Sequence, residues 1–191
     1  MPPLRLVATL LLLPLAALAA DRPLKVDRAR SFIDVDVQAT LHSFTGHLDR
    51  YDLSVNADES GKLKGGGLFA FKFADLRTGN PERDAAMLAW LGGGAPAGRF
   101  ELGTLALTPD GQGQASGRLT FHGATHLIEF AVNVAQAEGT YTVTGEATID
   151  YRHWGLKILR KALLVKVDPN VTVRFKLVGT LGAPVVPDTA K

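Results

Sequence analysis

Five histidines raise the question of a metal site, because two pairs of them stand close together along the chain. His122 and His126 flank a turn and would face each other across a hairpin, while His42 and His47 lie near a bend. Zinc sites normally take three or four protein ligands, and no compact third ligand accompanies either pair. Alternation also puts His122 on a polar face, opposite Phe121. We therefore expect surface or capping histidines and no metal.

The serines, carboxylates and glycines form no catalytic pattern. None of the serines stands in a Gly-x-Ser-x-Gly elbow. Asp34 and Asp36 share one face of a strand, where a solvated outer surface explains them. Gly65-Gly66-Gly67 lacks the Lys-Ser/Thr of a phosphate-binding loop. The chain has no cysteine, which excludes thiol catalysis, disulfides and thiolate metal sites. We predict that the protein is not an enzyme and has no catalytic residues.

Segments in which apolar and polar residues alternate predict an all-β, antiparallel fold. A strand with one apolar and one polar face is half buried, as strands of antiparallel sheets are. Turn residues at Pro109-Asp110-Gly111 and Ala137-Glu138-Gly139 favour hairpins. Consecutive hairpins favour a meander that closes into a barrel, and about eight strands just enclose one small ligand. The inward-facing, candidate ligand-binding residues are Phe69, Phe71, Phe73, Phe100, Phe121, Phe130, Val132, Val143, Ile149, Val173 and Phe175.

Two interruptions of the alternation predict β-bulges at barrel corners. Phe100 and Leu102 give way to Leu105 after a one-residue slip, and residues 46–48 give way in the same manner to Tyr51. A bulge inserts one residue and bends the strand.

One short helix is predicted over residues 80–91, across one end of the barrel. Asn80 can cap it, Pro81 suits its first position, and Gly92-Gly93-Gly94 ends it. The helix is either a lid over the barrel or a plug of its core, and the sequence favours neither.

The first 20 residues have the pattern of a secretory signal peptide. Arg5 is the only charge before Asp21, and the apolar run from Leu6 to Ala20 ends in small residues. The run is shorter than a bilayer requires, and Pro14 interrupts it. We expect a signal peptide at 1–20, a domain at 21–181, a flexible tail at 182–191 and a periplasmic location.

The remaining charges nearly balance. Of 21 Lys and Arg, one belongs to the predicted signal peptide, so 20 stand against 19 Asp and Glu. This balance gives no electrostatic reason to expect nucleic acid or an anionic membrane as a partner. No later stretch is long and apolar enough to span a membrane, so we expect no stable membrane insertion.

Two motifs resemble those of the YceI-like, polyisoprenoid-binding family. They are Leu76-Arg77-Thr78-Gly79-Asn80 with the following Arg83-Asp84, and the hairpin from Gly117 to His126. Weaker similarities at residues 46–48 and 152–155 follow in the family's order, and together they cover nearly all of the chain after residue 20. Arg30 and Ala86 stand where the family often has histidine.

The resemblance implies a lipocalin-like antiparallel barrel whose elongated apolar pore holds an isoprenoid chain. The positions that match the motifs, and that we expect to fix the helix and turn at the rim through caps and pairings, are Asn80, Arg83, Asp84 and His122. The expected ligand is an isoprenoid lipid or a quinone-type chain, with no other cofactor, and a homodimer stays open. The alternatives are a metal- or haem-associated envelope enzyme using His122, His126 and His153, or a ligand-free stress-response module.

Overall fold

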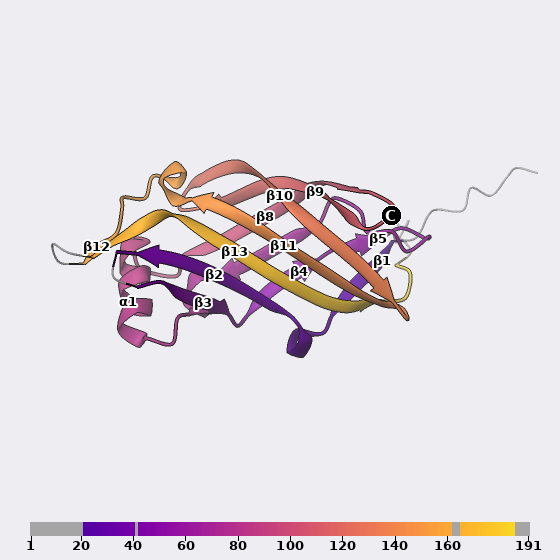
Figure 1. Ribbon diagram of the computed structural model, residues 1–191, viewed down its shortest axis with the longest axis horizontal. Coiled ribbons are helices and arrows are strands. Elements are labelled where there is room, and N and C mark those ends of the chain that lie inside the picture. Colours follow the sequence, from indigo (N-terminus) through magenta and orange to yellow (C-terminus); the bar gives the residue numbers. More distant parts are fainter. Residues whose placement is uncertain (1–20, 41, 162–164, 186–191) are drawn as a thin grey trace, which may run out of the picture.

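The protein is described by a computed structural model that covers residues 21–40, 42–161 and 165–185 (Figure 1). Within these ranges all the β-strands belong to one antiparallel sheet, accompanied by a single α-helix and three short 3-10 helices. The predicted all-β antiparallel class and the single helix are therefore confirmed. The predicted signal peptide, residues 1–20, lies outside the described residues. No helix in the described part of the chain is long and apolar enough to cross a membrane.

Long antiparallel strands form the middle of the sheet, and short strands form its margins. The order is β4-β6-β8-β9-β10-β11-β13-β2-β3-β7. The long strands are β2 (Phe32–Ala39), β8 (Ala97–Leu107), β9 (Gln112–Phe121), β10 (Ala124–Ala137), β11 (Thr140–Asp150) and β13 (Val165–Leu181). The short ones are β1 (Arg22–Val26), β3 (Phe44–Leu48), β4 (Tyr51–Ser54), β5 (Asn56–Ala57), β6 (Leu68–Lys72), β7 (Leu76–Arg77) and β12 (Arg160–Lys161).

Two parts of the predicted architecture need correction. The sheet has 13 strands in the described residues instead of about eight. Strands of two residues, such as β5, β7 and β12, are too short to show alternation. The sheet is also a curled half-barrel instead of a fully closed barrel: no described ladder joins β4 to β7, the two ends of the strand order. At the end away from α1, β1 pairs with both β13 and β5 and so links the two sides of the sheet (Figure 1).

Only one of the two predicted bulges is present. The register between β8 and β9 shifts between Leu102 and Thr104, at the predicted slip. The prediction before Tyr51 is wrong, because the chain leaves β3 at Leu48 and enters a separate strand, β4, which pairs with β6. A further shift lies in β13, between Val167 and Val171.

Helix α1 (Pro81–Trp90) begins and ends where the sequence predicts. The Asn80 side-chain oxygen accepts hydrogen bonds from the backbone N–H groups of Glu82 and Arg83 at 3.0 and 3.1 Å. Gly92 follows with φ of +96°, a conformation that favours glycine. The apolar side of the helix packs onto a buried cluster inside the nearby end of the sheet. The helix therefore forms part of the core there, as expected of a plug.

The paired region of the chain extends past the expected domain end at residue 181. The Gly182 N–H donates to the Pro23 carbonyl at 2.8 Å, and Val185 forms a bridge with Asp21. The first four residues of the predicted tail thus hold the two ends of the described chain together. Residues 186–191 lie outside the described residues.

Candidate ligand-binding cavity

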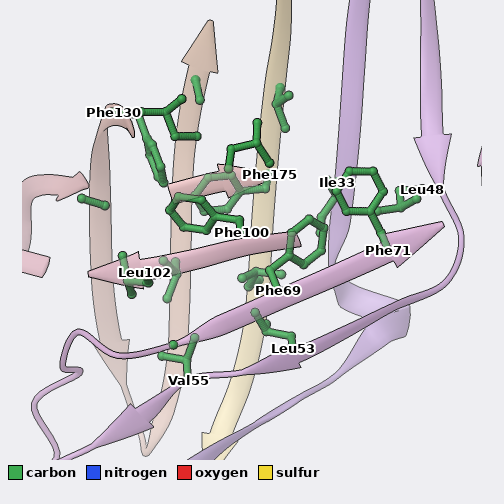
Figure 2. Close-up of a pocket in the computed structure, with 18 of the residues that line it drawn as sticks. Ile33, Leu48, Leu53, Val55, Phe69, Phe71, Phe100, Leu102, Phe130 and Phe175 are labelled. Carbon is green, nitrogen blue, oxygen red and sulfur yellow. The ribbon is translucent and has the colours of Figure 1, made fainter. Parts of the chain in front are cut away.

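An apolar cavity of about 260 Å³ lies on the inner face of the curled sheet (Figure 2). Every residue that lines it is aliphatic, aromatic or glycine, so among the described residues no side chain offers it a hydrogen bond. A ligand inside can therefore be held by burial of hydrocarbon, without directional contacts. Such a surface suits a chain that carries no polar group along the buried length.

All eleven residues predicted to face inward line this cavity. The structure thus brings together side chains from six strands and the 3-10 helix η2 (Phe73–Asp75), although contact with a ligand stays a prediction. The eleven are fewer than half of the lining, and the residues missing from them are spread over most strands and the loop before β6. Ile33 and Val35, for example, alternate with Asp34 and Asp36, a signal that was available in the sequence.

Phenylalanine rings form two continuous rows along the cavity. In the first, Phe69 and Phe71 stack at 5.2 Å between ring centroids, and Phe73 meets Phe71 edge-on at 5.1 Å. In the second, Phe130 lies 5.8 Å from Phe100 and 5.9 Å from Phe175. Figure 2 shows the rings of Phe69, Phe71, Phe100, Phe130 and Phe175 projecting from their strands into the same space. Aromatic contacts of this kind hold the rings in fixed positions, so the cavity wall is defined largely by ring faces and edges.

The cavity is long and narrow. On β11 its lining extends from Val143 to Ile149, and on β13 from Val171 to Leu177. Six residue steps on each strand correspond to ~20 Å at ~3.3 Å per residue. A volume of about 260 Å³ over such a length describes a channel for a single hydrocarbon chain.

Buried side chains pack at both ends of the channel. At the α1 end, Phe121 stacks on Trp154 at 4.6 Å, and Trp154 is 2% exposed. At the other end, buried Tyr141 donates a hydrogen bond from its hydroxyl to the Gly61 carbonyl at 2.7 Å.

Beside the channel, the Arg28 guanidinium lies 4.3 Å from the Tyr51 ring centroid and donates a hydrogen bond to the Tyr51 carbonyl. Burial raises the pKa of the Tyr51 hydroxyl.

Comparison with known protein families identifies the chain. The model of the YceI-like domain matches residues 24–179, from β1 to the last residues of β13. The chain belongs to the YceI-like family. No curated protein sequence matches it.

Solved structures share the YceI-like fold at low sequence identity. Burkholderia cenocepacia BcnA is 18% identical with a TM-score of 0.66, over 82% of this chain and 100% of that one. A polyisoprenoid binding domain from Saccharophagus degradans, implicated in plant cell wall breakdown, is 17% identical with a TM-score of 0.59, over 86% and 99%. The Campylobacter jejuni YceI protein is 16% identical with a TM-score of 0.55, over 71% and 83%. These similarities support the fold.

The polar motif residues predicted at the rim lie outside the cavity and hold its α1 end in place. Asp84 is 8% exposed and accepts two hydrogen bonds from Thr78, one from the backbone N–H at 3.1 Å and one from the hydroxyl at 2.6 Å. The Arg83 guanidinium lies 4.0 Å from the centroid of the Phe44 ring, a contact that the sequence did not indicate. Asn80 caps the helix. None of the three is among the cavity-lining residues.

His122 belongs to a tight hairpin turn. It adopts φ of +47° and is followed by Gly123 at +76° between β9 and β10, as a two-residue turn with two positive φ angles requires. Its Nδ1 atom lies 2.8 Å from the Trp154 carbonyl oxygen, which ties this turn to the 3-10 helix η3 (Tyr151–Trp154). The residue therefore fixes the turn against the end cluster.

Two of the other histidines lie close together near Trp154. His126 and His153 have ring centroids 5.8 Å apart beside Trp154, so the structure does bring His122, His126 and His153 to one region. In the described ranges, however, no three or more side chains of metal-ligating type are placed to hold an ion. His47 instead forms a 2.7 Å contact with Asp34.

Charged pairs occupy the outer face of the sheet, away from the cavity. Arg174 and the Thr45 hydroxyl donate to Asp36 and lower the pKa of that carboxyl. Hydrogen bonds from Arg152 lower the pKa of Asp150 to about 2. Apolar residues thus face inward and charged ones outward, as the alternation predicts.

Proposed function

We propose that this protein is a periplasmic carrier that holds the hydrocarbon chain of an isoprenoid lipid or a quinone and does not transform it. The observation that carries the proposal is the wholly apolar lining of the channel. In this proposal the curled sheet serves as a lipocalin-like container, and the polar end of the ligand stays outside. The polyisoprenoid-binding description of the Saccharophagus degradans domain, which has the same fold, supports it.

An empty apolar channel leaves its lining side chains without packing partners on one side. Each buried CH₂ group of a ligand contributes ~0.8 kcal/mol. Filling the channel with a chain therefore offers a large gain without any polar contact, which favours a ligand carrier over a ligand-free module.

Export from the cytoplasm follows from the first 20 residues. Their basic start, apolar run and small-residue end are the features of a cleaved signal peptide. We infer a mature chain that begins at Ala20 or Asp21 in the periplasm, where a water-insoluble chain needs a carrier. N-terminal sequencing of protein from the periplasmic fraction tests this, and an uncleaved chain in washed membranes would contradict it.

The carrier function is tested by identifying what co-purifies. Protein purified from bacteria without detergent should release an organic-soluble lipid with an isoprenoid chain, at close to one molecule per chain. The stripped protein should take up the same lipid from solution. Native mass spectrometry that shows only the unliganded mass after expression in several hosts, together with no uptake, would overturn the proposal.

A further inference from the structure

Three of the phenylalanine rings that line the channel lie directly against glycine. Gly98 on β8 pairs in register with Phe71 on β6. A Cβ atom placed on Gly98 would lie 2.3 Å from Cζ and 2.6 Å from Cε1 of Phe71, far inside van der Waals contact. The Phe71 ring therefore occupies the space that any other residue at position 98 would fill.

The same arrangement recurs at two other places along the channel. Gly145 on β11 pairs with Phe175 on β13, and a Cβ there would lie 2.5 Å from Cζ of the ring. A Cβ on Gly117 of β9 would lie 2.5 Å from Cζ of Phe100 on β8, but the Glu101 carbonyl oxygen would be closer still, at 2.3 Å, so the backbone also requires glycine there. The rings in question are channel-lining residues from both phenylalanine rows.

Two other glycines of the sheet serve a different purpose. At Gly113 and Gly179 the atoms nearest to an added Cβ are backbone carbonyl oxygens, at 2.0 and 2.4 Å, so these glycines permit close approach of strands. At Gly98 all three nearest atoms belong to the Phe71 ring. Gly98 is thus required by the position of a ring and not by the backbone.

We propose that Gly98 and Gly145 are specificity-determining residues that set the width of the channel by letting phenylalanine rings lie flat against the wall. This rests on the proposed carrier function. A methyl group at Gly98 would force the Phe71 ring back by about 1 Å to reach ordinary contact distance. The ring can move only into the channel, because the sheet lies behind it.

Channel width matters most for a chain with methyl branches. An isoprenoid chain carries a methyl group on every fourth main-chain carbon, whereas a straight alkyl chain of equal length is uniformly thinner. Narrowing the channel should therefore disfavour the branched chain more than the straight one. The glycines would thus select for the isoprenoid class by leaving room for its branches.

Gly98→Ala and Gly145→Ala test this, with Gly103→Ala as the matched control. Gly103 lies on the same strand as Gly98 but does not line the channel, and a Cβ there would be 3.5 Å from its nearest neighbour. The probes are hexadecanol and phytanol, which have the same alcohol group and the same main-chain length and differ in methyl branches. Affinities are measured on lipid-stripped protein by calorimetry or fluorescence competition.

The wild type and Gly103→Ala should bind both alcohols, and the two test variants should lose roughly tenfold in affinity for phytanol, as overpacking of an apolar site predicts. Their affinity for hexadecanol should change less than threefold. The double variant Gly98→Ala/Phe71→Leu, in which the displaced ring is gone, should recover phytanol binding, and it serves as the readout if Gly98→Ala fails to fold.

Equal losses for both alcohols, no loss for either, or no recovery in the double variant would overturn the proposal while leaving the carrier function intact. If the wild type binds neither alcohol, the carrier function itself is wrong. In that case, xenon binding to the empty channel tests whether these glycines set its width. Gly98→Ala should reduce xenon binding, and Gly103→Ala should not. Unchanged xenon binding in Gly98→Ala would overturn the proposal.

Discussion

Two phenylalanines that both line the channel should respond differently to truncation. Phe121 is 7% exposed and is enclosed by the Trp154 ring at 4.6 Å and by the Phe73 ring at 5.7 Å. Phe71 is only half buried, because one side of its ring faces the channel. The pair separates a packed core position from a channel wall, although the residue type is the same.

The expected costs follow from this difference in enclosure. Phe121→Ala removes a fully packed ring and should destabilise the protein by ~3–5 kcal/mol, the range for core phenylalanines. Phe71→Ala enlarges an existing space, and its ring buries less surface to begin with. A loss of ~1.5–3 kcal/mol is expected there, from the smaller transfer free energy.

Urea unfolding of lipid-stripped protein, followed by far-ultraviolet circular dichroism, measures both free energies. Stripping is essential because a bound chain would fill the space left by Phe71 and mask the loss. The slopes of the two unfolding transitions should agree, so that the midpoints report stability. Costs that agree within ~0.5 kcal/mol would refute the reasoning, since they would mean that the channel collapses onto Phe71 in the unliganded protein.

The remaining predictions concern polar contacts that hold the channel in place. Asp84→Ala leaves two Thr78 donors without their acceptor and should cost ~2–4 kcal/mol in urea unfolding, whereas exposed Glu82→Ala on the same helical turn should cost well under 1; equal costs would contradict this. Tyr141→Phe removes the hydrogen bond to the Gly61 carbonyl and should cost about 1 kcal/mol, and an unchanged unfolding midpoint would show that the bond adds nothing. Because the folded pKa of Asp150 is depressed from 3.8 to about 2, its pairing with Arg152 stabilises the fold above about pH 4, and this contribution is lost as the pH falls towards 2. The stability difference between wild type and Asp150→Asn should therefore be largest at neutral pH and shrink between pH 4 and pH 2; a difference independent of pH would argue against it.

Local sequence patterns predicted the long strands, the helix and the inner face. Phe69 and Phe71 alternate with polar or small residues, and they do lie side by side on one face. Asn80 and Pro81 marked the start of α1 because capping depends on residues within one turn. The slip after Leu102 located a bulge for the same reason, since a bulge shifts the phase of its own strand.

Contacts between distant segments were not predictable in this way. The closure of one end depends on β1 pairing with both β13 and β5, and strand β5 has only two residues. The Arg83 guanidinium contacts the Phe44 ring, although four strands lie between the two residues along the chain, and no local pattern links them. The same holds for His126 and His153, which meet because η3 folds back over the β9–β10 hairpin.

The harder question is why alternation alone does not distinguish an open channel from a packed core. Both give strands with one apolar face, and Phe130 or Val173 would satisfy either. The difference lies in what stands opposite each ring on the neighbouring strand. A ring opposite glycine on one neighbouring strand can lie over that strand, in the space that a Cβ atom would otherwise take. Phe71 with Gly98 and Phe175 with Gly145 have this arrangement. These pairs can be recognised only when the strand register is known, so the channel becomes evident from the sequence and the register together.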